Sequence, residues 1–266
     1  MILSGTGGEE SNTERGAAQD GRFWEVDAAR GVAIAMMVVY HLTYDLDYFG
    51  GYGIDSTLGV WAHFADATAS AFLFLVGVSL AISYSKASAA RRGRNLFGKY
   101  LLRGIRILAY GIVLTVVFLA FGMGVVAFGI LHLIGVSIIL AYPLLKYRLV
   151  NLFLGLCVIA AGWYMRAQEV SSESAWLLPL GVVPENLFMP DYRPLLPWFG
   201  VVLLGLFAGN VLYASGKRPA GVPRRAPQIA RLLLPLGRNS LFIYLIHQPI
   251  LVALLAALGV IELGTL

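Results

Sequence analysis

Residues 22–50, RFWEVDAARGVAIAMMVVYHLTYDLDYFG, begin with charged side chains, continue as an apolar run and then become polar again. Only ten residues, GVAIAMMVVY between Arg30 and His41, are uninterruptedly small or apolar. Whether this segment spans a membrane is decided by the whole chain, which is 58% hydrophobic and 13% charged, with a mean hydropathy of +0.75. Soluble domains are about 45–50% apolar and about 25% charged. We therefore predict an integral membrane protein.

Seven apolar segments approach the roughly 20 residues that a helix needs to cross a ~30 Å hydrocarbon core. No segment shows the alternating pattern of a barrel strand, and lipid requires each backbone polar group to be satisfied internally. We therefore expect an all-α polytopic membrane helical bundle of about seven transmembrane helices. The expected spans are 28–46, 62–84, 100–121, 125–145, 149–166, 196–214 and 239–261.

The basic residues of the connecting loops predict the orientation. Cytoplasmic loops carry an excess of Lys and Arg, whereas the connection at 47–60 has neither. We expect a multi-pass protein of the cell membrane with a cytoplasmic N-terminus. The basic residues lie near two connections: Lys86, Arg91, Arg92, Arg94, Lys99, Arg103 and Arg106 after the second span, and Lys217, Arg218, Arg224, Arg225, Arg231 and Arg238 after the sixth.

Several function classes lack their usual residues. Residues 1–21 are polar and rich in small residues, which predicts a disordered N-terminal tail and a single domain over 22–266. The lone Cys157 offers neither a disulfide framework nor a thiolate metal site, and we expect no metal. We attribute the net charge of +5 to loop basicity and expect no nucleic-acid partner. Zinc-protease, esterase and Walker motifs are missing from the sequence.

Arg30 and His41 lie almost three full helical turns apart, so they share one face of the first helix at an axial separation of about 16 Å. Asp27 precedes Arg30 by three positions, a spacing at which carboxylate and guanidinium can pair. Arg30 can alternatively be a positive residue that snorkels to the interface. An intramembrane histidine such as His41 indicates a functional site by default, with an interhelical hydrogen bond as the alternative.

Three further histidines follow. His132 and His247 fall near the midplane of their spans, where neutral imidazoles can converge as bases, proton relays or interhelical contacts. We expect His63, at the start of the second span, to be interfacial. The long segment 167–195, with its prolines, can either cover a pocket or pack on the bundle.

The run VDAARGVAIAMMVVYH resembles the first transmembrane helix of the heparan-alpha-glucosaminide N-acetyltransferase catalytic-domain family, and more distantly that of membrane acyltransferases with an R-x10-H signature. The resemblance continues through ADATASAFLFLVGVSLAIS, FGILHLIGVSIILAYP, LLPWFGVVLLGLFAG and LGRNSLFIYLIHQPI. It implies a transmembrane acyltransferase-like domain that moves an acetyl group from cytoplasmic acetyl-CoA to an amine or hydroxyl of a sugar or glycan across the membrane.

The resemblance also implies roles for individual residues. His41 would be the catalytic histidine, although lysosomal members place theirs after the first helix, where this chain has His63. Arg30, Arg103 and Arg106 would bind the donor, and Asp27 would orient Arg30. The pocket would be lined by Asp66, His132, His247 and Gln248.

Two other function classes remain open from the sequence. One is a small transporter or flippase with a histidine-lined polar path. The other is a non-catalytic assembly subunit. We expect contact with membrane lipid in each of these function classes, and the sequence leaves a homo-oligomer open.

Overall fold

The computed structural model describes residues 22–90, 95–120, 125–168, 172, 174–184, 189 and 191–261. The tail predicted at 1–21 and the loop arginines 91, 92 and 94 lie outside the described residues. The described chain is helical, as expected. Its α-helices are α2 (Trp24–Tyr48), α3 (Gly59–Ala90), α4 (Phe97–Ala120), α5 (Ile130–Ala141), α6 (Arg148–Ala167), α7 (Leu195–Leu212), α8 (Gln228–Arg238) and α9 (Ser240–Ala257), with short 3₁₀ helices η1 (Tyr142–Leu144), η2 (Ala175–Leu180) and η3 (Ala214–Gly216).

Within the described ranges, six helices are long and apolar enough to cross a membrane, namely α2, α3, α4, α6, α7 and α9. This confirms an all-α polytopic bundle. The segment expected to span over 125–145 forms a shorter apolar helix, Ile130–Leu144. Its 15 residues extend about 22 Å, which is less than the ~30 Å hydrocarbon core. Leu133, Ser137 and Ile138 of α5 are fully buried, so this helix is a central packing element.

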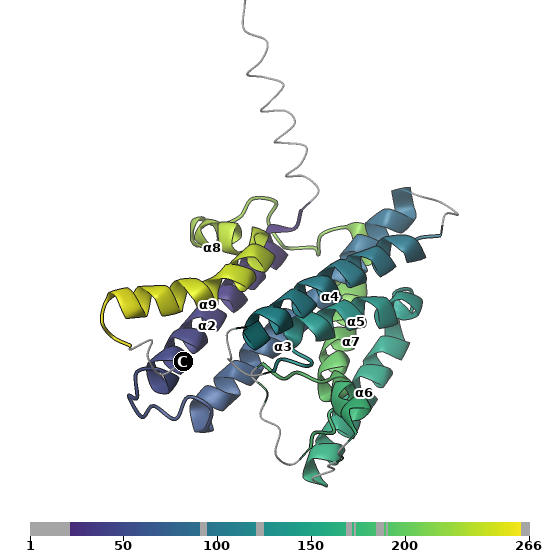
Figure 1. Ribbon diagram of the computed structural model, residues 1–266. Helices are drawn as coiled ribbons and strands as arrows, with labels where there is room; N and C mark the ends of the chain where they lie inside the picture. The colour runs from purple at the N-terminus through teal and green to yellow at the C-terminus, as the bar shows by residue number, and fades with distance from the viewer. Residues whose placement is uncertain are drawn as a thin grey trace, which may run out of the picture.

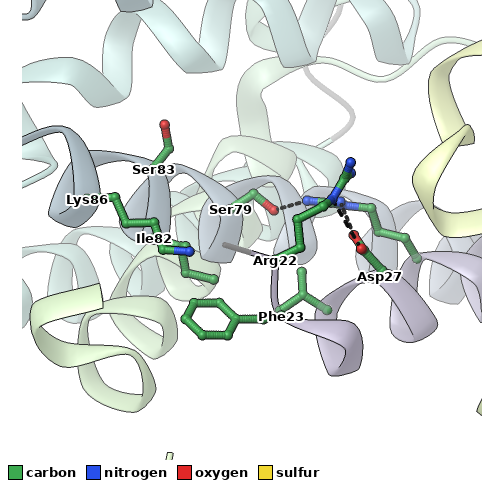
Figure 2. A pocket seen from close by; sticks show the side chains of 9 residues that line it. Arg22, Phe23, Asp27, Ser79, Ile82, Ser83 and Lys86 are labelled. Carbon is green, nitrogen blue, oxygen red and sulfur yellow. Dashed lines mark hydrogen bonds and ion pairs between the residues drawn. The ribbon is translucent and has the colours of Figure 1, made fainter. Parts of the chain in front are cut away.

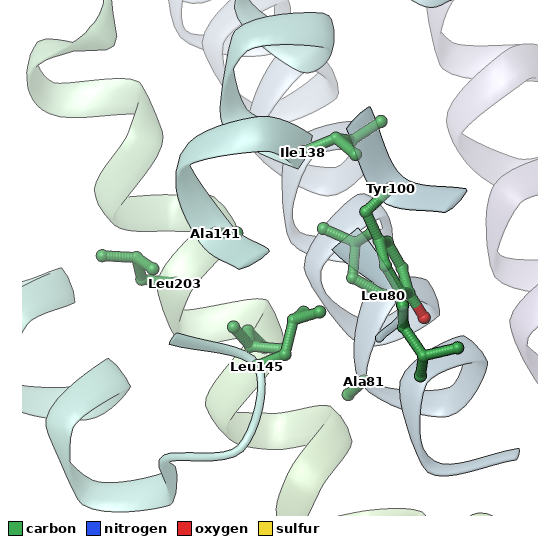
Figure 3. Close-up of a cluster of buried hydrophobic side chains, with 9 residues drawn as sticks. Leu80, Ala81, Tyr100, Ile138, Ala141, Leu145 and Leu203 are labelled. Atoms are coloured by element: carbon green, nitrogen blue, oxygen red, sulfur yellow. The ribbon is translucent and has the colours of Figure 1, made fainter. Parts of the chain in front are cut away.

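Helix α7 packs against α3 on one side and α6 on the other (Figure 1). Small residues permit this close approach, as is typical of membrane helix interfaces. A Cβ atom added at Gly205 would overlap the carbonyl oxygen of Phe74 on α3. Figure 3 shows the cluster beside this contact, in which side chains from α3, α4, α5 and α7 meet: Leu80, Tyr100, Ile138 and Leu203.

Helix α2 contacts α3, α8 and α9 (Figure 1). Helix α8 falls within a stretch expected to be a basic loop, so it is an element that the hydropathy pattern does not predict. It is short and contains Pro235. Its position beside the start of α2 brings the last connecting segment of the chain to the first helix.

The described part of segment 167–195 packs on the bundle. Leu178 and Val182 are buried. The Tyr192 hydroxyl donates a hydrogen bond to the Leu178 carbonyl at 2.6 Å. Burial raises the pKa of Tyr192 to about 12, so this hydroxyl keeps its proton at neutral pH. Of the two alternatives for this segment, these contacts favour packing.

Candidate functional site

A buried carboxylate organises the beginning of α2. Asp27 has a side chain that is 4% exposed, and it lies 3.2 Å from Arg30, 3.4 Å from Arg22 and 3.6 Å from Arg238 of α8. The pairing of Asp27 with Arg30 is the one that their spacing predicts. Because an unpaired buried carboxylate is costly, these guanidinium groups offset the cost of burying Asp27.

Asp27, Arg30 and Arg22 help to line a pocket of about 210 Å³, which lies between the start of α2 and the C-terminal part of α3 (Figure 2). Arg30 extends across it and donates a hydrogen bond to the Ser79 hydroxyl. The Lys86 ammonium lies 4.2 Å from the centre of the Phe23 ring. Basic residues outnumber acidic ones in the lining, which consists of Arg22, Phe23, Val26, Asp27, Arg30, Ser79, Ile82, Ser83 and Lys86.

The two other arginines expected at this end differ in their position. Arg103 of α4 is half-buried and close enough for its charge to act on Arg30. Arg106 is exposed, and neither Arg103 nor Arg106 belongs to the pocket lining. Arg22 and Lys86 line the pocket, although the sequence did not single them out as donor residues.

Packed side chains separate this pocket from His41. Ile34 and Met37 are buried and lie between Arg30 and His41 on the same face of α2. The pocket lining does not reach beyond Arg30 along that helix. The helical face that Arg30 and His41 share is therefore apolar between them.

The two histidines of α2 and α9 meet in the interior. The ring centres of His41 and His247 are 4.7 Å apart in an edge-to-face arrangement. His247 Nδ1 lies 2.7 Å from the Tyr244 carbonyl oxygen. A carbonyl can only accept a hydrogen bond, so Nδ1 carries a proton, and in the neutral imidazole Nε2 then has the lone pair. Both His247 Nε2 and His41 Nδ1 are buried without a hydrogen-bond partner among the described residues.

A carboxylate and an amide complete this cluster. Asp45 is fully buried, and its Oδ1 accepts a hydrogen bond of 2.5 Å from Gln248 Nε2. Asp45 Oδ2 and Gln248 Oε1 have no partner within the described chain. We call His41, Asp45, His247 and Gln248 the histidine cluster. Asp45 was missed by the sequence analysis, although its position four residues after His41 puts it on the same helical face.

A second polar group lies towards the other end of the bundle. Arg193 pairs with Asp66 at 3.1 Å and stacks on Trp198 at 4.9 Å. Asp191 Oδ2 accepts hydrogen bonds from the Tyr244 hydroxyl at 3.1 Å and from the backbone nitrogen of Ile130 at 3.3 Å. Tyr244 thus bonds to Asp191 through its side chain and to His247 through its carbonyl.

His132 is not brought to the histidine cluster. Its Nδ1 accepts a hydrogen bond from the Gly129 backbone nitrogen at 3.3 Å, and its ring packs over Gly111 of α4. This contact caps the start of α5. His63 is exposed at the start of α3, as an interfacial residue would be. Within the residues described, no group of three potential metal ligands occurs.

These features define a polytopic membrane protein with a basic pocket at one end of its first helix and a buried polar cluster further along it. The chain belongs to the family described as heparan-alpha-glucosaminide N-acetyltransferase, catalytic, whose model matches residues 22–249. It is thus a member of a membrane acetyltransferase family, as the resemblance implied. No curated protein and no solved structure matched the chain.

Proposed function

We propose that this protein is a membrane-embedded acyltransferase that moves an acetyl group from cytoplasmic acetyl-CoA to an amine or hydroxyl of a sugar or glycan on the other side. The observation that carries the proposal is the histidine cluster, within the matched region of an acetyltransferase family. Its unpartnered nitrogen atoms, on His41 and His247, are buried and would supply the base.

The donor would bind at the basic pocket. The phosphates of coenzyme A are anionic, and guanidinium groups bind phosphate well. Arg30 and Arg22 would contact them directly, with Lys86 on the opposite wall of the pocket. Arg103 would add to the local positive charge, whereas Arg106 is exposed and would act at a distance.

The acetyl group must then travel from this pocket to His41. The axial distance from Arg30 to His41 is about 16 Å. Ile34 and Met37 line that path and are buried, so the pantetheine arm would have to displace them. This step is a binding-induced rearrangement of packed side chains.

His41 would act as the general base. It takes the proton of the acceptor amine or hydroxyl while the acceptor atom bonds to the thioester carbonyl carbon. The carbon–sulfur bond then breaks, and the coenzyme A thiolate leaves and takes that proton. His247 would be a positioning residue, because its Nε2 lone pair can accept an N–H of the protonated His41 ring.

The acceptor would approach from the end that carries Asp66, Asp191 and Arg193. Carboxylate and guanidinium groups are suited to hydrogen bonds with sugar hydroxyls. Tyr244 joins this region to His247, so an acceptor held there would lie next to the histidine cluster.

The test is an acetyl-transfer assay with the purified protein in nanodiscs, using labelled acetyl-CoA and a panel of amino sugars and neutral glycans. Base catalysis contributes about 10²- to 10⁴-fold, so His41→Ala should lower kcat/KM by about that factor. The matched control is His63→Ala, because this histidine is exposed and lies at the start of another helix. It should retain transfer.

Loss of transfer in His63→Ala, with transfer retained in His41→Ala, would assign the catalytic role to His63. Wild-type transfer in both variants would remove histidine catalysis from the proposal. If no acceptor is acetylated but the protein carries a substrate-dependent proton flux in liposomes, the transporter interpretation would replace it.

A further inference from the structure

Helix α8 takes no part in the proposed reaction, yet it is held firmly against α2. A Cβ atom added at Gly237 would overlap the Asp27 carbonyl oxygen, and one added at Gly31 would overlap the Leu233 carbonyl oxygen. The two backbones therefore touch. Upstream of α8, Trp24 Nε1 donates a hydrogen bond of 2.9 Å to the Pro223 carbonyl. These contacts fix α8 at the level of the first two turns of α2.

The segment 217–238 contains six basic residues and neither Asp nor Glu. Some of this charge is neutralised by α2, since Arg218 pairs with Glu25 at 3.2 Å and Arg238 with Asp27 at 3.6 Å. Within the described chain, no carboxylate lies at ion-pair distance from the three other arginines. These three are exposed: Arg224, Arg225 and Arg231.

An apolar edge accompanies the arginines. Ile229 is 81% exposed and Leu232 is 77% exposed. Three positions separate them, so they share one face of α8. Arg231 is rotated from Leu232 by about 100° and from Ile229 by about 160°. The outward surface of α8 therefore has an apolar face and a basic face, the pattern of a helix that lies in a membrane interface.

We propose that α8 and the preceding loop form a binding site for anionic phospholipid in the leaflet at the end where α2 begins. Ile229 and Leu232 insert among the upper acyl chains, while Arg224, Arg225 and Arg231 bind phosphate groups. Charge complementarity selects the partner, because the exposed groups beside this apolar face are cations that no carboxylate of the described chain neutralises. The proposal is independent of the acetyl-transfer reaction.

The experiment measures retained lipid by native mass spectrometry after extraction from vesicles of mixed phosphatidylcholine and phosphatidylglycerol. The wild-type protein should retain phosphatidylglycerol in preference to phosphatidylcholine. A basic residue near an anionic surface is worth about fivefold in binding. The triple variant Arg224→Gln, Arg225→Gln, Arg231→Gln should therefore lose that preference by fivefold or more. The matched control is Arg166→Gln, because Arg166 is an exposed arginine at the end of α6. This variant should leave the lipid preference unchanged.

A second variant separates charge from folding. The triple Arg→Lys variant keeps the charge and should keep the lipid preference. An unchanged preference in the triple Gln variant would overturn the proposal. Displacement of phosphatidylglycerol by millimolar inorganic phosphate would also overturn it, because the arginines would then form a site for soluble anions. Neither readout depends on acetyl-CoA, so failure here leaves the acyltransferase proposal untouched.

Discussion

The imidazole rings of His41 on α2 and His247 on α9 are 4.7 Å apart, edge to face, so the first and last spanning helices of the described chain meet through two histidines. Each ring has a buried nitrogen without a partner among the described residues. His247 Nδ1 donates a hydrogen bond to the Tyr244 carbonyl, so the lone pair of the neutral ring lies on Nε2. This relationship makes His247 the residue whose role is most sharply testable.

We predict that His247→Asn lowers kcat and leaves KM for acetyl-CoA nearly unchanged. The asparagine amide nitrogen can still donate to the Tyr244 carbonyl, but the shorter side chain places no acceptor at the position of Nε2. Loss of one buried hydrogen-bond partner is worth about 1–3 kcal/mol, which corresponds to about 5- to 150-fold in rate. Steady-state kinetics across a pH series would measure this. A lower thermal stability with an unchanged kcat and pH profile would make His247 a structural residue only.

The Asp45–Gln248 contact should contribute to stability. Replacing Gln248 by Leu leaves a fully buried carboxyl group without the hydrogen bond that Gln248 donates to it. We expect a loss of about 1–3 kcal/mol in the free energy of unfolding. The double variant Asp45→Leu, Gln248→Leu removes both polar groups and should recover part of that loss. Thermal unfolding in detergent of the wild type, the two single variants and the double variant measures this, and additive effects of the single changes would show that the contact carries no coupling energy.

How far the sequence predicts this site depends on how local each relationship is. The Asp27–Arg30 pair and the shared face of Arg30 and His41 follow from helical spacing. His247 and Gln248 could be chosen as polar residues within a span, but the pairing of Gln248 with Asp45 depends on how α9 packs against α2. His132 satisfies the backbone at the start of its own helix, and hydropathy carries no signal for that contact.

Two elements of the fold illustrate the same limit. Hydropathy detects α5, but the helix is shorter than the apolar segment, and most of its residues are buried against other helices. Helix α8 escapes a search for long apolar runs, because basic residues and Pro235 interrupt it. Its apolar residues at 229, 232, 233 and 236 have helical spacing, and that signal could have revealed an amphipathic helix.

Two glycines, one in the close contact between α3 and α7 and one at an open position of α4, should respond differently to replacement by alanine. Gly205→Ala would place a Cβ against the backbone of Phe74, and we expect a loss of about 1–3 kcal/mol. Gly98→Ala, in the first turn of α4, meets no atom within 4 Å and should be neutral or slightly stabilising, since alanine favours helix by up to about 1 kcal/mol. Chemical or thermal unfolding of both variants in one detergent tests this. Equal stability of the two would contradict the close approach.

The ion pairs of Asp27 should have graded energies. Arg30 has a side chain that is 23% exposed, whereas that of Arg22 is 53% exposed. Because solvent screens the outer pair, Arg22→Gln should cost less than about 1 kcal/mol of unfolding free energy. Arg30→Gln removes the less exposed partner of the buried Asp27 and should cost about 3 kcal/mol. The effect of Arg22→Gln should vanish at high salt, whereas that of Arg30→Gln should persist. A similar loss in both variants would mean that burial does not distinguish the two pairs.

The charge pattern of the loops predicts which ends of the bundle face the cytoplasm, and cysteine labelling can test it. The native Cys157 is exposed on α6, so it is first replaced by Ser. A membrane-impermeant thiol reagent applied to intact cells should label Asp55→Cys, in the connection without basic residues, and should fail to label Lys217→Cys until the membrane is opened. Asp55 and Lys217 follow helices that begin at opposite ends of the bundle, α2 and α7, so one orientation must expose one and shield the other. Labelling of Lys217→Cys alone in intact cells would reverse the predicted orientation and, with it, the side from which the donor is proposed to enter.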